Sequence, residues 1–211
     1  MMLNKKFLNA RHLMIDIETF GIGGDAPVYQ IGATTFSFTE PGHDVQEYEF
    51  FENINIVNQV EKGARLDPET MKWHAENNAK NFIEYMTGPK ATEKDCLVRF
   101  ANFVKATKAE FVWANGLLFD IAKIQKLFDL FGVEFPDIAY NKYVDMRFLR
   151  QMLPEDFRKE ADEIAKTNSI TEDEQQHDAL TDANWQAEFC KVAIDYLKNK
   201  GVSTYANDGY S

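Results

Sequence analysis

The sequence predicts a single α/β domain in which helices flank a sheet. Three observations support this fold class: runs of strand-forming residues fill the first third of the chain, the apolar period becomes helical after Gly63, and a strand-turn-helix pattern follows in the middle. A length of 211 residues suits one domain with a substantial core. We therefore expect residues 1–200 to form one domain and residues 201–211 to be a C-terminal tail with little to bury.

Three β-rich runs predict an antiparallel meander. They extend from Arg11 to Asp16, from Val28 to Phe38 and from Glu47 to Ile56. The meander places Asp16 at the end of its first strand. The segment GIGGDAP between the first two runs lacks the spacing of a dinucleotide-binding loop, and a strand rather than a helix follows it. A βαβ nucleotide-binding or redox domain is therefore excluded.

Helical patterns begin after the meander. Asp67 is placed to cap a helix that opens with Pro68, a second helix covers NAKNFIEYM, and Thr92 is placed to cap a third that reaches Ala106. The run EFVWANG then predicts a buried strand that ends at Asn115.

The rest of the chain is predicted to be mainly helical. FDIAKIQKLFDLFG predicts an amphipathic helix that ends at Gly132, with Asp120 in its first turn and Lys123 and Lys126 on its solvent face. The polar segment 155–176 predicts a short helix and an exposed loop, and 179–198 predicts a long final helix.

Composition excludes several classes of protein. Hydrophobic residues make up 45% and charged residues 27% of the chain, as in ordinary globular proteins, and no apolar run approaches the roughly 18 residues of a membrane span. Residues 1–11 lack the apolar core of a secretory signal, so we expect a cytoplasmic protein. Cys96 and Cys190 lie in helical patterns and are expected to be buried free thiols.

The chain is acidic, with 23 basic and 34 acidic residues and a net charge of −11. Such a protein is not expected to coat long nucleic acid by electrostatics alone. A local site where carboxylates hold metal ions against a phosphate remains compatible with this charge.

Four acidic residues and one histidine fall where they can carry chemistry. Asp16 and Glu18 are two apart in a strand, so their side chains share one face, and two carboxylates beside apolar neighbours are costly to bury without a cation. Asp120 opens a helix, where an acid can equally serve the helix dipole. His177 and Asp182 flank the start of the last helix. Taken singly, each has an ordinary structural explanation.

Together these residues resemble the three motifs of the DEDDh family of 3′-to-5′ exonucleases, in the family's order. The matching residues are Asp16, Glu18 and Thr19 for Asp-x-Glu-Thr, Phe119 and Asp120 for Phe-Asp, and His177, Ala179 and Asp182 for His-x-Ala-x-x-Asp. The resemblance implies a ribonuclease H-like fold, with a mixed sheet in which an antiparallel meander is followed by parallel strands.

Finer features resemble the phage and prophage branch that includes exonuclease VIII and exodeoxyribonuclease A, with mycobacterial-type exoribonucleases nearby. They are DAPVYQIGA, ETMKWHAENN, VWANGLLFD and VDMRFLRQM. The chain departs from this pattern at two places. Asn115 and Gly116 stand where many members have His-Asn, and Trp73 and His74 stand where the branch often has two tryptophans.

The resemblance also implies the site residues. Two ions, Mg²⁺ or Mn²⁺, would be held by the oxygen donors that such ions prefer, and a histidine would act as general base. The expected metal ligands are Asp16, Glu18, Asp120 and Asp182, the base is His177, and the candidate substrate-binding residues are Thr19, Phe20, Asn115, Trp73 and Arg147. Thr19 and Phe20 are candidates for a hydroxyl contact and a base wedge, and Arg147 for a phosphate contact. Core packing is the alternative for Thr19, Phe20 and Trp73, and a surface ion pair for Arg147.

The predicted function is a metal-dependent 3′-to-5′ exonuclease that acts on single-stranded 3′ ends, DNA being favoured, and releases nucleoside 5′-monophosphates. RNA is the alternative, because recognition of the 2′-hydroxyl rests on one or two contacts that no motif reveals. A nucleic-acid-binding module without activity would be expected to lack one of the acids or the histidine, and all five are present. No membrane partner is expected. A homodimer stays open, since some relatives exchange substrate-binding residues between subunits.

Overall fold

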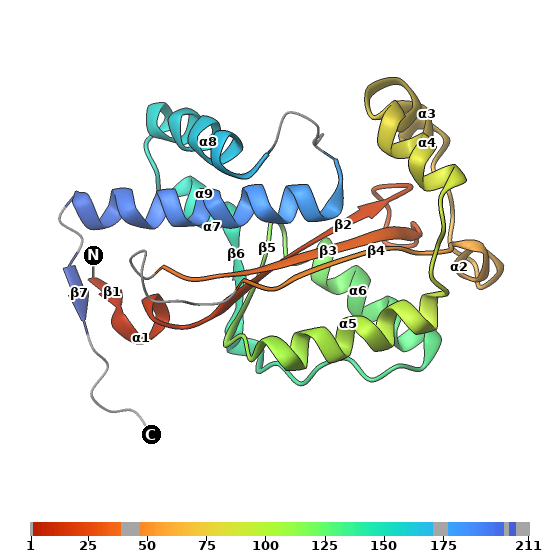
Figure 1. The fold of residues 1–211 in the computed structure, drawn as a ribbon, viewed down its shortest axis with the longest axis horizontal. Coiled ribbons are helices and arrows are strands. Elements are labelled where there is room, and N and C mark those ends of the chain that lie inside the picture. Colours follow the sequence, from red (N-terminus) through yellow and green to blue (C-terminus); the bar gives the residue numbers. More distant parts are fainter. Residues whose placement is uncertain (1, 39–46, 171–176, 201–202, 206–211) are drawn as a thin grey trace.

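The computed structural model describes residues 2–38, 47–170, 177–200 and 203–205, and its centre is a mixed sheet of five strands (Figure 1). In spatial order the strands are β4 (Glu49–Asn53), β3 (Val28–Phe36), β2 (His12–Thr19), β5 (Phe111–Ala114) and β6 (Tyr143–Asp145). The pairs β2–β3 and β3–β4 are antiparallel, whereas β2–β5 and β5–β6 are parallel. The predicted mixed sheet, a meander followed by parallel strands, is confirmed.

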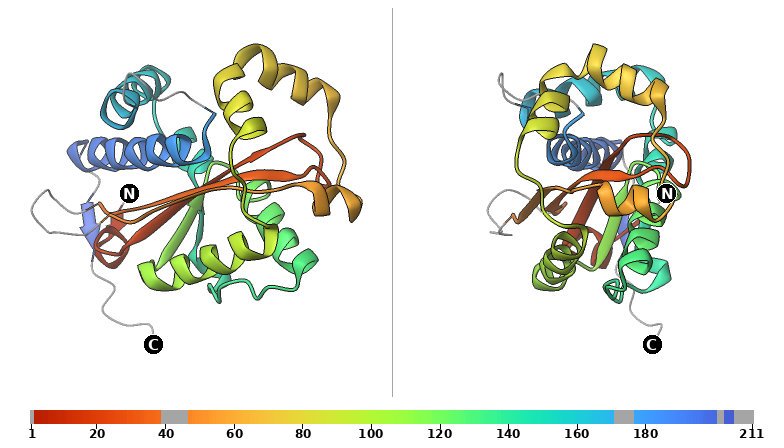
Figure 2. Two further views of the ribbon diagram at one scale, coloured as in Figure 1. Left: turned by 45° about the vertical axis from the view of Figure 1, so that its right-hand side comes forward. Right: turned by 90° about the vertical axis from the view of Figure 1, so that its right-hand side faces the viewer.

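Helices cover both faces of this sheet. On one face lie α5 (Glu93–Thr107) and α6 (Asp120–Phe131), and on the other lies α9 (Ala179–Asn199) with α7 (Met146–Gln151) and α8 (Glu155–Ser169) (Figures 1 and 2). At the end of the sheet where β2 turns into β3 stand α2 (Val57–Glu61), α3 (Pro68–Asn77) and α4 (Ala79–Thr87). The predicted caps are confirmed, because Asp67 accepts from Glu69 N and Thr92 accepts from Asp95 N. Gly132 ends α6 in a left-handed conformation, as predicted.

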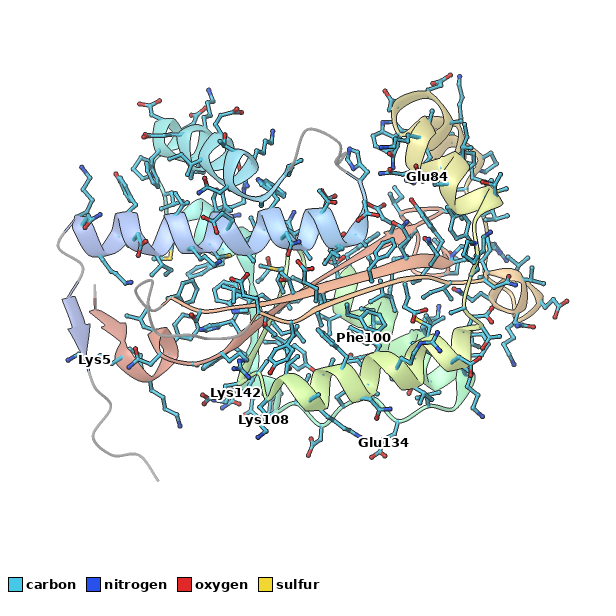
Figure 3. The ribbon with its side chains drawn as sticks, viewed as in Figure 1. Lys5, Glu84, Phe100, Lys108, Glu134 and Lys142 are labelled. Atoms are coloured by element: carbon cyan, nitrogen blue, oxygen red, sulfur yellow. The ribbon has the colours of Figure 1, made fainter. Side chains whose placement is uncertain are left out.

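The central strand β2 is buried on both faces, which decides where its acids point. Leu13, Ile15 and Ile17 belong to the apolar cluster under α5 and α6, in which Phe100 of α5 also lies (Figure 3). Met14 belongs to the cluster under α9. Because side chains alternate along a strand, Asp16 and Glu18 share the face of Met14 and point towards α9.

The structure differs from the predicted elements in several places. Strand β2 continues to Thr19, so Asp16 lies inside the strand rather than at its end, since pairing with β3 extends through Glu18. Helix α8 has 15 residues and is longer than the predicted short helix, and the predicted loop at 171–176 lies outside the described residues. In the predicted tail, Ser203–Tyr205 forms β7, which pairs in parallel with β1 (Met2–Asn4).

Short elements were not predicted at all. They are β1, α1 (Lys5–Leu8), α2, the 3-10 turn Tyr140–Lys142, β6 and α7. Elements of three to six residues contain too few positions for an apolar period to be recognised. The predicted buried free thiols at Cys96 and Cys190 are confirmed. Among the described helices, none is both long and apolar enough to cross a membrane.

Candidate active site

The two acids of β2 meet the first turns of α9. Asp16 is buried, and its Oδ1 accepts a hydrogen bond of 2.7 Å from Gln186 Nε2 on α9. Glu18 is half-buried two residues further along the same face. The two carboxylates therefore lie between the sheet and the helix.

Helix α9 approaches the sheet closely because of one glycine. Gly32 on β3 pairs with Asp16, and a Cβ atom at Gly32 would lie 2.1 Å from the carbonyl carbon of Ala179. Asp178 caps the helix by accepting from Leu180 N. This close contact places Asp182, in the first turn of α9, beside the acids of β2.

Asp120 comes to these carboxylates from the chain that follows β5, the strand that pairs with β2 on the edge opposite β3. It is buried in the first turn of α6, after the loop that follows β5. Asp145, which caps α7, holds this loop, because its Oδ2 accepts from Leu117 N at 3.2 Å and its Oδ1 accepts from Arg147 N at 2.9 Å. The ends of two parallel strands, β5 and β6, thus fix the loop that carries Asp120.

A cavity of about 630 Å³ brings the predicted residues together. The five residues expected to be catalytic line it: Asp16, Glu18, Asp120, His177 and Asp182. Asn115 and Arg147, two of the expected substrate contacts, line it as well. Residues up to 166 positions apart in sequence, from Asp16 to Asp182, therefore form one site.

His177 stands at the edge of this cavity. Its Nδ1 lies 4.0 Å from Asp182 Oδ2, and its backbone N–H donates to the same oxygen at 3.2 Å. Its ring meets the Trp73 ring edge to face, with 4.7 Å between centroids. Partial burial lowers the pKa of His177, so the ring is neutral near pH 7 and able to accept a proton.

The carboxyl groups of the site are difficult to ionise together. Burial raises the pKa of Asp120 and of Asp182 to about 7, and Arg147 partly offsets this for Asp120. Burial, followed by repulsion from the other acids, raises the pKa values of Asp16 and Glu18 well above the ordinary range. Such shifts arise when like charges share a site with little solvent.

The donor set suits a hard divalent cation. Carboxylate oxygens are the preferred ligands of Mg²⁺ and Mn²⁺. Ligand atoms of Glu18, His177 and Asp182 all lie within 4.8 Å of one another. The buried Oε1 of Gln186 has no hydrogen-bond partner in the described part of the chain, which leaves one more oxygen acceptor at the site. A bound cation would relieve the repulsion that raises the pKa values of the carboxyl groups.

The Arg147 guanidinium lies beside Gly116, one of the two residues that stand where many DEDDh members have His-Asn. Gly116 has a φ of +128°, and a Cβ atom there would lie 1.3 Å from Arg147 Nη2. A residue with a side chain at position 116 would therefore displace the guanidinium. Arg147 is more than half exposed and 3.8 Å from Asp145, so it combines an ion pair with access to the cavity.

Two of the expected substrate contacts are buried at the turn between β2 and β3. Phe20 is 1% exposed and stacks on Tyr29 with 4.1 Å between ring centroids, so it offers no free face to a base. Thr19 is buried, and its hydroxyl donates to Gly21 O at 2.7 Å. Their alternative role, packing at the β2–β3 turn, is the one that the structure supports.

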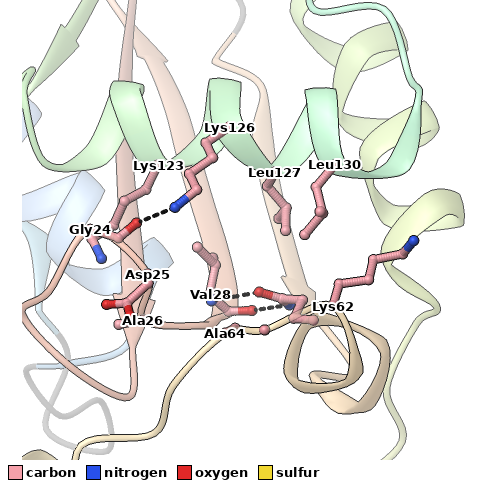
Figure 4. A pocket seen from close by; sticks show the side chains of 12 residues that line it. Gly24, Asp25, Ala26, Val28, Lys62, Ala64, Lys123, Lys126, Leu127 and Leu130 are labelled. Carbon is pink, nitrogen blue, oxygen red and sulfur yellow. Dashed lines mark hydrogen bonds between the residues drawn. The ribbon is translucent and has the colours of Figure 1, made fainter.

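Of the two lysines of α6, Lys126 is on the solvent face as expected and Lys123 is not. Lys123 is buried rather than on a solvent face, and its Nζ donates to Gly23 O. It lines a cavity of about 100 Å³ beside the Gly-rich turn (Figure 4). Lys126 is exposed and donates to Gly24 O at 2.9 Å. Both lysines therefore hold the Gly-rich turn after β2, which leads into the β2–β3 hairpin.

Sequence reasoning missed two residues of the site. Gln186 contacts Asp16, and Trp185 lines the cavity with its buried Nε1 unpaired among the described groups. Gln186 follows Asp182 by four residues and so lies on the same helix face, a spacing from which it could have been found. Trp185 carried no comparable signal.

The family model described as the 3′-5′ exoribonuclease Rv2179c-like domain matches residues 11–194. No significant match was found among curated protein sequences.

Three solved structures show the same fold. The nuclease domain of 3′hExo, a DEDDh family member bound to rAMP, gives a TM-score of 0.57 at 12% identity, covering 98% of this chain and all of that one. Zinc-bound E. coli ExoI in complex with single-stranded DNA gives 0.57 at 17% identity, covering 90% of this chain and 43% of that one. The RNase domain of yeast Pop2 gives 0.51 at 10% identity, covering 95% and 83%.

Proposed function

This chain belongs to the family of 3′-5′ exoribonuclease Rv2179c-like domains, and from this we propose that it removes nucleotides from single-stranded 3′ ends, with RNA as the preferred substrate. The products would be nucleoside 5′-monophosphates. The family match supports RNA. DNA, the substrate expected from the sequence, is the competing assignment, and the structural relative ExoI was solved with single-stranded DNA.

One observation carries the proposal: four carboxylates and a neutral histidine line the same cavity. We propose that Asp16, Glu18, Asp120 and Asp182 hold two Mg²⁺ or Mn²⁺ ions. When bound, such ions supply the positive charge that makes a water more acidic and offsets charge on the phosphate oxygens. An acidic protein could then accept a polyanion at this one place.

His177 takes the proton of the attacking water in this proposal. Its Nδ1 faces Asp182 Oδ2, so Nε2 is the ring nitrogen left to accept the proton. The lowered pKa of His177 keeps Nε2 unprotonated at neutral pH. Asp182 accepts from the backbone N–H of His177, so it would position this residue as well as bind a cation.

The remaining contacts would place the 3′ end. We propose that the Arg147 guanidinium binds a phosphate of the substrate, since it combines partial exposure with a place in the cavity wall. Asn115 offers an amide in the same wall, and Trp73 offers a 40% exposed ring on which a base can stack.

The test uses 5′-labelled RNA and DNA of identical sequence, each incubated with Mg²⁺, Mn²⁺ or EDTA. We expect a ladder that shortens from the 3′ end in the presence of a metal only, with the RNA cleaved faster. Asp182→Asn, which keeps the shape of the side chain, should abolish cleavage and leave the circular dichroism spectrum unchanged. Faster cleavage of DNA would reverse the substrate assignment, and absence of cleavage of both strands with either metal would refute the proposal.

A further inference from the structure

The backbone of His177 has an unusual conformation. Its φ is +67°, and among the described residues other than glycine only Lys108 shares a positive φ. Lys108 caps the end of α5, where this conformation is common. His177 lies before the start of α9 instead. A residue with a side chain stays in this left-handed region only where its surroundings hold it.

The contacts that hold His177 come largely from α3 and α4. Its carbonyl oxygen accepts from Asn78 Nδ2 at 2.9 Å and from Asn81 Nδ2 at 3.3 Å. Its ring rests against Trp73 of α3 at an interplanar angle of 88°. These contacts link segments almost 100 residues apart in the chain.

Asn78 is itself held in place. It stands between the end of α3 and the start of α4, where its N–H donates to His74 O and its carbonyl accepts from Phe82 N. It is 2% exposed, and its buried Oδ1 lacks a partner within the described part of the chain. A buried amide with an unpaired oxygen is costly for folding. The side chain of Asn78 makes one favourable contact that offsets this cost, the hydrogen bond from its Nδ2 to His177 O.

We propose that α3 and α4 form a clamp that positions His177 over the carboxylates, with Asn78 as its principal positioning residue. Asn78 fixes the backbone of His177, and Trp73 fixes the plane of its ring. Neither contact occupies Nε2, the ring nitrogen that faces away from Asp182, so it stays available to accept a proton. The inference rests on the proposed function in one respect, that His177 acts on the attacking water.

The experiment compares Asn78→Ala with Asn77→Ala. Asn77 is the same residue type, one position earlier and exposed, and its side chain bonds only Trp73 O among the described groups. Two properties are measured for each protein: kcat and KM on the 5′-labelled RNA, and the NMR resonances of the imidazole rings. The chain has four histidines, and the resonance missing from His177→Gln identifies that of His177.

We expect Asn78→Ala to lower kcat by about 10- to 100-fold with KM changed by less than about threefold, because a general base displaced by about 1 Å loses most of its effect. The His177 resonance should lose the ring-current shift from Trp73. The resonance of His12, which lies in another part of the core, should not move and so reports an intact fold. Asn77→Ala should match the wild type in both measurements.

An unchanged kcat, or a reduced kcat with the His177 resonance in place, would overturn the clamp. If Asn78→Ala does not fold, Asn81→Ala removes only the longer hydrogen bond and should shift both readouts in the same direction by a smaller amount; no shift in either would also overturn it. The NMR comparison does not depend on cleavage. A wild-type protein without activity would therefore refute the proposed function and still decide whether Asn78 places His177.

Discussion

Burial acts on the acids and the histidines of this protein in opposite directions. It raises the pKa values of Asp120 and Asp182 to about 7 and lowers that of His12 to about 4. A carboxyl group with a raised pKa binds its proton more readily in the folded state. It adds to the free energy of unfolding at low pH, and this contribution is lost as pH rises through about 7. For His12 the lowered pKa has the opposite effect, since it reduces the free energy of unfolding at low pH.

His12 should make the fold sensitive to acid. The ring is fully buried, its Nε2 donates to Phe7 O at 2.9 Å, and its Nδ1 accepts from Trp113 Nε1 at 2.9 Å, so it is neutral with both nitrogens satisfied. The unfolded chain takes up a proton near pH 6.5 and the folded chain only near pH 4. The free energy of unfolding therefore falls between pH 6.5 and 4, by roughly 3 kcal/mol from this group.

Urea unfolding of the wild type and of His12→Gln across pH 4 to 7 isolates this effect from that of the acids. Glutamine can keep both hydrogen bonds without titrating. As pH falls below 6.5, the free energy of unfolding of the wild type should decrease more than that of the variant. If the free energies of unfolding of the two proteins change with pH in parallel over the whole range, His12 is not the source of the acid sensitivity.

His177→Ala should separate proton transfer from metal binding. General base catalysis contributes about 10²- to 10⁴-fold, so the cleavage rate should fall by that amount. The four carboxylates stay in place, so Mn²⁺ affinity measured by calorimetry should change little. Added imidazole should restore part of the rate, because it can enter the space that the ring vacates. An unchanged rate at neutral pH would exclude His177 as the base.

The contact between β3 and α9 depends on a single glycine. A Cβ atom at Gly32 would meet backbone atoms of Ala179 and Leu180 within 2.3 Å, and backbone atoms cannot turn aside as a flexible side chain can. We expect Gly32→Ala to shift the start of α9 and thereby Asp182. The activity should fall by about 100-fold or more, and the free energy of unfolding by about 1–3 kcal/mol.

Gly24→Ala is the matched control for this change. A Cβ atom at Gly24 would have nothing within 4 Å, and its backbone shows no positive φ. Its stability in thermal unfolding and its cleavage rate should equal those of the wild type. Equal effects of the two substitutions would show that the close approach at Gly32 does not position the site.

For the molecule as a whole, divalent ions should be a source of stability. A ligand that binds only the folded state at 100 times its dissociation constant adds about 2.7 kcal/mol to the free energy of unfolding. Protonation of the acids competes with metal binding. The gain from Mg²⁺ or Mn²⁺ should therefore be larger at pH 8 than at pH 5.5, because the carboxyl pKa values are raised.

Thermal unfolding with metal and with EDTA at both pH values measures this gain. Asp182→Asn removes one ligand and should reduce the gain at pH 8. A metal-induced shift that is the same in this variant would place the ions elsewhere on this acidic protein.

Local signals were sufficient for much of the fold. A helix cap needs only a side chain and the N–H groups two or three residues later, so Asp67 and Thr92 mark helix starts without reference to the rest of the chain. Gly132 marks a helix end for a similar reason, since its left-handed conformation favours glycine. The three motifs likewise identified the acids and the histidine that line the cavity.

Contacts between distant segments required the folded chain. The bond from Gln186 to Asp16 spans 170 residues, and the bond from Asn78 to His177 spans 99. Phe20 and Lys123 had a surface role expected of them, but neighbours from other elements bury both. A sequence pattern shows which residues share the face of one element. Which face of another element they meet depends on how the elements pack, and here that depends on features such as the absent side chain at Gly32.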